Sequence, residues 1–192
     1  MKNLILLLTF STVFLSCNSK RLDNTKELSK EIKASQIKRV TNTQLIYTVD
    51  EWGKKISQIA QKALEKEITA FPDKAGEVCK NPETIPVLAA LRKEYGVAIH
   101  LLTEADTASK ILFPKEKELL QAYLYSAKNN PTSKDNIQQL NDSLLVYNTP
   151  VPGDNVICKA CAVSQKTGFA LWRLLFDKKQ IIRKLDAKQL KE

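Results

Sequence analysis

The sequence predicts one α+β domain with a long N-terminal helix, several short helices and a small antiparallel sheet. Between residues 43 and 68, apolar side chains recur every three or four positions, which is the spacing of one helix face. Shorter apolar runs at residues 97–103, 144–147 and 169–176 predict strands, and a turn at 177–180 leads to a further strand at 181–185. This order of helices, strand, helix and then strands is typical of the α+β class.

The chain begins with an expected export signal at residues 1–17. Its apolar run from Leu4 to Leu15 is too short to span a bilayer as a mature helix. Ser16 followed by Cys17 is the bacterial lipoprotein pattern, in which Cys17 is lipidated and becomes the new N-terminus. We therefore expect a soluble domain that is lipid-anchored at the periplasmic face of a bacterial membrane, the outer membrane in particular. Simple secretion is the alternative.

Residues 18–40 are predicted to be a charged linker, and residues 41–192 the domain. The net charge is +9, and residues 20–41 hold seven basic against three acidic side chains. An exported chain rarely meets nucleic acid, so we expect no nucleic-acid binding. The basic linker instead suits the surface of anionic lipid headgroups.

The first helix, residues 43–68, has a capping box available in Thr41 and Gln44, although Gly53 weakens its middle. Pro72 fits the first turn of a short helix that ends at Cys79. Another helix is expected from Pro82 to Tyr95, closed by Gly96.

The strand at residues 97–103 follows, and a loop then leads to a helix from Pro114 to about residue 128. Residues 129–143 are polar and predict a loop. The Pro150–Gly153 stretch predicts a tight turn that leads the chain to Cys158.

Three cysteines follow the lipid anchor: Cys79, Cys158 and Cys161. A Cys-x-x-Cys pair in an exported chain is a haem anchor, a redox-active disulfide, half of a zinc site or a structural disulfide. Zinc would need Cys79 and His100, the only histidine, as further ligands. A thioredoxin-type site begins a helix, whereas this pair is expected between a turn and a strand. The pair is also one residue short of a c-type haem motif, because Ala162 stands where Cys-x-x-Cys-His has its histidine.

Residues 38–185 resemble the c-type haem domains of the Tll type. The resemblance rests on segments in a shared order: Glu77-Val78-Cys79, Tyr95-Gly96, Tyr147-Asn148-Thr149-Pro150, the Cys-x-x-Cys pair, and Gly168 to Phe176. It implies a PAS-like core with one covalent haem, used for sensing or electron transfer. It further implies that Cys158 and Cys161 form the thioethers and that Cys79 reaches the iron from the opposite side.

Two departures from this family argue against haem. Ala162 cannot bind iron, and residues 102–113 lack the Arg and Asn-Pro signature that follows the family's first strand. His100 could replace the missing ligand only if the fold brought it to the iron. We therefore expect no cofactor, and one disulfide shared among the three cysteines. A Cys158–Cys161 bridge is the simplest choice, whereas a bridge from Cys79 would close about 80 residues and constrain the unfolded chain far more.

The leading functional hypothesis is a haem-free binding or redox-responsive module without catalytic activity, which takes a small ligand or a signalling partner protein. A genuine c-type cytochrome domain and a structural envelope lipoprotein are the alternatives. Other candidate residues carry less chemistry. Ser143 and Ser164 have no nearby histidine to activate them, and Glu116 and Glu118 are expected on different, solvated helix faces.

Overall fold

The computed structural model describes residues 29, 40–129, 134–162 and 168–189, with backbone only for 186–189. The predicted signal segment, the predicted lipidation site Cys17 and nearly all of the predicted linker lie outside these residues. Residues 38–192 form one compact unit.

The fold is α+β and is built on one four-stranded sheet. Its strand order is β1-β4-β3-β2, and each neighbouring pair is antiparallel. The strands are β1 (Val97–Thr103), β2 (Asn136–Gln139), β3 (Leu144–Pro150) and β4 (Ala170–Asp177). The predicted strands at 97–103, 144–147 and 169–176 are therefore confirmed, with shifts of one to three residues at their ends.

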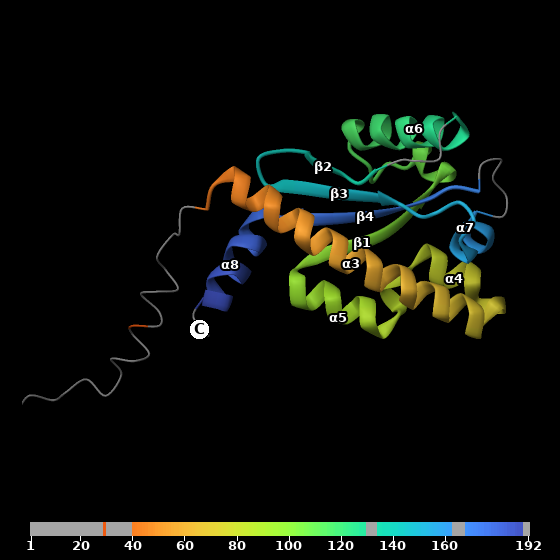
Figure 1. Cartoon of the computed structure of the whole chain (residues 1–192), viewed down its shortest axis with the longest axis horizontal. Helices are drawn as coiled ribbons and strands as arrows, with labels where there is room; N and C mark the ends of the chain where they lie inside the picture. The colour runs from red at the N-terminus through yellow and green to blue at the C-terminus, as the bar shows by residue number, and fades with distance from the viewer. Residues whose placement is uncertain (1–28, 30–39, 130–133, 163–167, 190–192) are drawn as a thin grey trace, which may run out of the picture. The chain divides into compact units, whose positions relative to one another are not determined.

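Helices cover both faces of this sheet (Figure 1). The helix α6 (Pro114–Asn129) lies on one face, and α3 (Asn42–Ala70) crosses the other. Beside α3 are α4 (Ala75–Lys80), α5 (Pro86–Tyr95), α7 (Val156–Cys161) and α8 (Lys178–Gln189). Within the described ranges, no helix has both the length and the apolar character needed to cross a bilayer.

The alternation of side chains along each strand separates two hydrophobic cores. Ile99, Trp172 and Tyr147 point to the α3 side and join the larger core. Leu102 and Leu171 point to the α6 side, where they pack with Tyr123 of α6 in a smaller core. The sheet therefore divides the domain into two compartments, and the face on which a residue lies decides which site it can join.

The helix α3 begins as the sequence predicts. The Thr41 side chain accepts a hydrogen bond from the Gln44 backbone N–H at 3.2 Å, and the Gln44 side chain accepts one from the Thr41 N–H at 2.9 Å. The apolar spacing of the sequence also predicts Ile59 and Ala63 on the buried face, but the structure buries Ala60 and Leu64 and leaves those two partly exposed. A face at 3.6 residues per turn drifts along so long a helix.

Several predicted elements differ in the structure. The helix expected from Pro82 is interrupted at Ile85, whose backbone is extended, so Pro82–Thr84 is a separate 3-10 turn before α5. Residues 136–139, expected as loop, form β2, and residues 181–185, expected as a strand, belong to α8. The Cys-x-x-Cys segment, expected between a turn and a strand, is the helix α7. Asn155 caps that helix through its side chain, which accepts from the Ile157 N–H at 2.9 Å.

Gly53 permits the close contact between α3 and the sheet. A Cβ atom at this position would lie 2.5 Å from the ring of Tyr147, a core residue on β3 whose hydroxyl donates to Asp135. Gly53→Ala is therefore expected to destabilise the domain by about 1–3 kcal/mol, despite the better helix propensity of alanine.

The matched control is Gly76→Ala in α4, where nothing lies within 4 Å of the new Cβ. Because only helix propensity changes there, we expect no loss of stability. Urea unfolding measures both variants, and equal effects at the two glycines would contradict the close packing of Gly53 on Tyr147.

Candidate functional site

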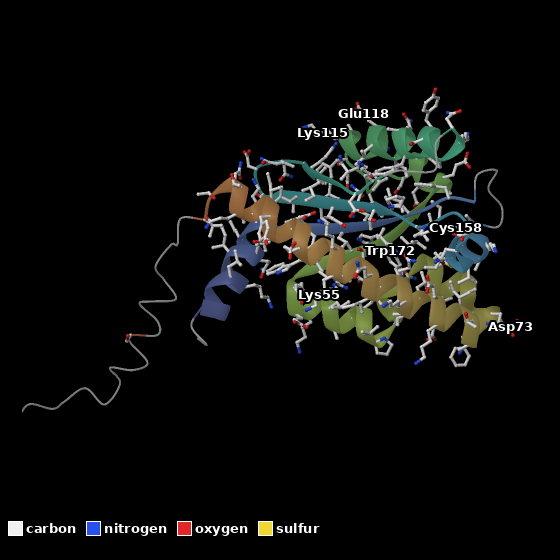
Figure 2. The ribbon with its side chains drawn as sticks, in the orientation of Figure 1. Lys55, Asp73, Lys115, Glu118, Cys158 and Trp172 are labelled. Carbon is white, nitrogen blue, oxygen red and sulfur yellow. A yellow bond between two sulfur atoms is a disulfide. The ribbon has the colours of Figure 1, made fainter. Side chains whose placement is uncertain are left out.

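The three cysteines of the domain lie together on the α3 side of the sheet. Cys158 and Cys161 are on α7, which packs against α3 and α4, and Cys79 is in the last turn of α4. The α7 cap is itself tied to α3, because the Asn155 amide donates to the carboxylate of Glu65. Figure 2 shows Cys158 at α7, away from Lys115 and Glu118 on α6.

A disulfide joins Cys79 to Cys161, with a Cα–Cα distance of 5.4 Å and a sequence separation of 82 residues. One disulfide among the three cysteines was expected, but the simplest pairing, Cys158 with Cys161, was wrong. The bridge links the ends of two short helices that are far apart in sequence. It therefore closes a long loop of the unfolded chain, the arrangement in which a disulfide stabilises most.

Cys158 keeps a free thiol, which is 2 % exposed. Its Sγ lies 3.4 Å from the Pro152 carbonyl oxygen, to which the thiol can donate a hydrogen bond. Burial raises the pKa of the Cys158 thiol, the Ala170 backbone N–H opposes this rise, and the Asp154 carboxylate adds to it. Because the thiolate is the nucleophile, a buried and protonated Cys158 is a weak attacking group.

His100 does not join this cluster. It lies on β1 between Ile99 and Leu101, which point to the α3 side, so its side chain points to the α6 side. The zinc site that would combine Cys79 with His100 is therefore not assembled. Among the residues that the structure describes, no group of three or more His, Cys, Asp or Glu side chains is arranged to hold a metal ion.

The residues around the Cys-x-x-Cys pair do not fit covalent haem. Thioether attachment needs two free thiols, and the sulfur of Cys161 is already bonded to Cys79. Among the described residues, this position also offers no iron ligand, since Ala162 carries only a methyl group and His100 lies across the sheet. The resemblance also suggests Cys79 as an iron ligand. Its sulfur is not available, because it is bonded to that of Cys161.

Comparison with protein-family models, with curated proteins and with solved structures finds no match to this chain. What the site can do is therefore inferred from its geometry alone.

A second polar cluster lies on the α6 side of the sheet. Cross-strand register aligns four polar residues in one row: His100 on β1, Arg173 on β4, Asn148 on β3 and Asn136 on β2. Arg173 donates from Nε and Nη2 to the Glu116 carboxylate of α6 at 2.6 and 3.1 Å.

The ion pair in this cluster is buried, because both side chains are 2 % exposed. The expectation that Glu116 is solvated was wrong. Glu116 also accepts a hydrogen bond from the Phe113 backbone N–H at 3.0 Å, at the start of its own helix. The available sequence signal was a Glu in the first turn of a helix, where a carboxylate is favourable.

His100 makes the stability of the folded domain depend on pH, and the direction of its pKa shift gives the sign. Burial lowers the pKa of His100 from its ordinary 6.5, and the Arg173 and Arg92 charges add to this, whereas Glu83 and Glu116 oppose it. The folded state therefore binds a proton on His100 less readily than the unfolded state does. The contribution of His100 to the free energy of unfolding is complete above pH 6.5. It is lost as the pH falls from 6.5 through the pKa of the folded state.

We expect the free energy of unfolding to decrease between pH 7.5 and 5.5, and His100→Gln to flatten this decrease. Because His100 is the only histidine, no other side chain titrates ordinarily in that window. Urea unfolding at a series of pH values measures it. A wild-type stability that increases as the pH falls would contradict the assignment.

Proposed function

We propose that this chain is a haem-free, non-enzymatic binding module, tethered by a lipid on Cys17 to the periplasmic face of a bacterial membrane. In this proposal the domain has a PAS-like arrangement and descends from the c-type haem domains that its sequence resembles. Cys161 of its Cys-x-x-Cys pair stabilises the fold through a disulfide in place of haem attachment.

The pairing of Cys161 with Cys79 carries this proposal. It removes one of the two thiols that haem attachment requires, and it uses the third cysteine to do so. The remaining thiol, Cys158, is buried and protonated, so thiol–disulfide exchange is also disfavoured. A structural bridge is the role that suits Cys79 and Cys161, and packing in the core is the role that suits Cys158.

The test is expression of the full chain in the periplasm of a host that matures c-type cytochromes. We expect a colourless protein whose intact mass lies about two hydrogens below that of the reduced chain, as one disulfide requires. A c-type cytochrome domain expressed in the same host shows that the machinery works. A Soret band together with a haem-sized increase in mass would overturn the proposal in favour of a cytochrome domain.

A further inference from the structure

The two edge strands of the sheet, β1 and β2, differ in whether other parts of the fold bond to their outward backbone groups. At the β1 edge, outward-pointing backbone N–H groups are covered by carboxylates: Ile99 donates to Glu83 at 3.2 Å and Thr103 donates to Asp106 at 2.7 Å. Such covering is one way in which proteins keep an edge strand from pairing with another chain.

The β2 edge has no such cover within the described part of the chain. Leu140 donates to the Leu144 carbonyl at 3.0 Å, which fixes the phase of the β2–β3 ladder. Antiparallel residues alternate between facing the partner and facing away, so the N–H and C=O groups of Ile137 and Gln139 point outward. No hydrogen bond from the described residues reaches these outward groups. They form a short template for one further strand.

Two adjoining hollows of about 560 and 370 Å³ run between α6 and β2, next to this edge. They share Leu119 and Ala122 of α6 as their common wall. Gln138 and Gln139 line the larger hollow, and Asn136 lines the smaller. An added strand would direct alternate side chains to the α6 side, where these hollows lie.

Three of the polar side chains along these hollows have groups without a partner among the described residues: Asn136, Lys115 and Glu118. The Asn136 Oδ1 atom is buried and accepts no hydrogen bond, which is costly unless a ligand supplies the donor. Lys115 and Glu118, on the α6 wall, form no ion pair with any described residue. Their opposite charges suit polar side chains of both kinds. This chemistry favours a polar peptide over an apolar ligand.

The base of the hollows is held in place before any ligand arrives. Asp135 accepts hydrogen bonds from the Tyr147 hydroxyl at 2.5 Å and from the Thr149 hydroxyl at 2.6 Å. The Tyr123 hydroxyl of α6 donates to the Lys134 carbonyl at 2.6 Å. The start of β2 is thus fixed to both β3 and α6, and binding there requires little ordering of this chain.

We propose that the β2 edge binds an extended segment of a partner protein as a fifth strand. The partner's main chain pairs with Ile137 and Gln139, and its donor side chains on the α6 side enter the hollows, one of them reaching Asn136 Oδ1. This mode of binding takes affinity from backbone hydrogen bonds and specificity from pockets for alternate side chains. The inference is independent of whether the domain is haem-free.

The probe is a library of displayed, unconstrained random peptides of about seven residues, selected on the full-length protein in detergent. Synthetic copies of enriched peptides are then titrated by fluorescence anisotropy. We expect Gln139→Pro to weaken binding at least tenfold, because proline removes an outward N–H. That N–H takes no part in the β2–β3 ladder, so the fold is retained.

Gln139→Ala is the matched control, because it removes the same side chain and keeps the N–H. Both variants lose whatever affinity the Gln139 side chain supplies at the wall of the larger hollow, so we expect Gln139→Pro to bind peptide at least about tenfold more weakly than Gln139→Ala. If Gln139→Pro does not fold, hydrogen exchange on the wild-type protein tests the same contact. Bound peptide is expected to slow exchange of the Ile137 and Gln139 amides.

Three results would overturn the proposal. The first is that no peptide is enriched, and the second is that enriched peptides bind without protecting the Ile137 and Gln139 amides. The third is a concentration-dependent dimer that Gln139→Pro dissociates and Gln139→Ala does not. In that case the edge binds a second copy of this chain.

Discussion

Replacing Cys79 with alanine is expected to lower the free energy of unfolding by about 2–4 kcal/mol and the melting temperature by about 5–15 °C. The bridge to Cys161 spans 82 residues, so its loss releases a large loop in the unfolded chain. Chemical denaturation and calorimetry measure the change. Reductant should destabilise the wild type by a similar amount and leave Cys79→Ala unaffected.

Cys158→Ala is the control for this prediction. It removes a buried thiol but keeps the bridge, so we expect a loss of only about 1 kcal/mol. The order of the two effects distinguishes the pairings. If Cys158→Ala abolished the response to reductant and Cys79→Ala did not, the bridge would join Cys158 to Cys161 instead.

Glu116→Ala is expected to produce the other large effect, a loss of about 3–5 kcal/mol. Arg173, whose side chain is 2 % exposed in the ion pair, would lose this countercharge, and the Phe113 N–H would lose its acceptor. Denaturant unfolding measures the loss. The double replacement Glu116→Leu with Arg173→Met should recover much of the stability, because it removes both charges together.

Lys54→Met is the matched control for the buried pair. Lys54 forms an ion pair with Asp50 at 2.6 Å, but both side chains are substantially exposed. Exposed pairs on a helix contribute little, so we expect no measurable change. A Glu116→Ala variant as stable as Lys54→Met would show that Arg173 does not depend on its partner.

Elements with a long, regular pattern could be predicted from the sequence. The face of α3 and its Thr41–Gln44 cap were readable because they repeat a local rule over many residues. The short strand β2 could not be predicted, because its sequence, Asn-Ile-Gln-Gln, has neither a regular apolar–polar alternation nor an apolar run. Its pairing with β3 comes from the tertiary fold.

Two helices were misassigned although cap signals were present. Asn155 before α7 and Asp177 before α8 both accept hydrogen bonds from first-turn N–H groups. In α8 the short apolar run of Ile181, Ile182 and Leu185 is ambiguous between helix and strand, and the Asp177 cap decides it. These caps were available to sequence reasoning and would have corrected both elements.

The candidate site was only half predictable. The sequence identified the three cysteines and the missing histidine, which are chemical facts of the chain. It could not choose among the three pairings, because the contact between α4 and α7 exists only in the folded domain. For the same reason the burial of Glu116 against Arg173, on a strand 57 residues away in sequence, was not foreseen.

The most direct test of this account is a peptide map of the unreduced protein from a host that matures c-type cytochromes. The account predicts one disulfide-linked pair of peptides, carrying Cys79 and Cys161, and an alkylatable Cys158 that reacts only after unfolding. A haem-bearing peptide with both Cys158 and Cys161 modified would contradict it, as would a Cys158–Cys161 bridge with Cys79 free.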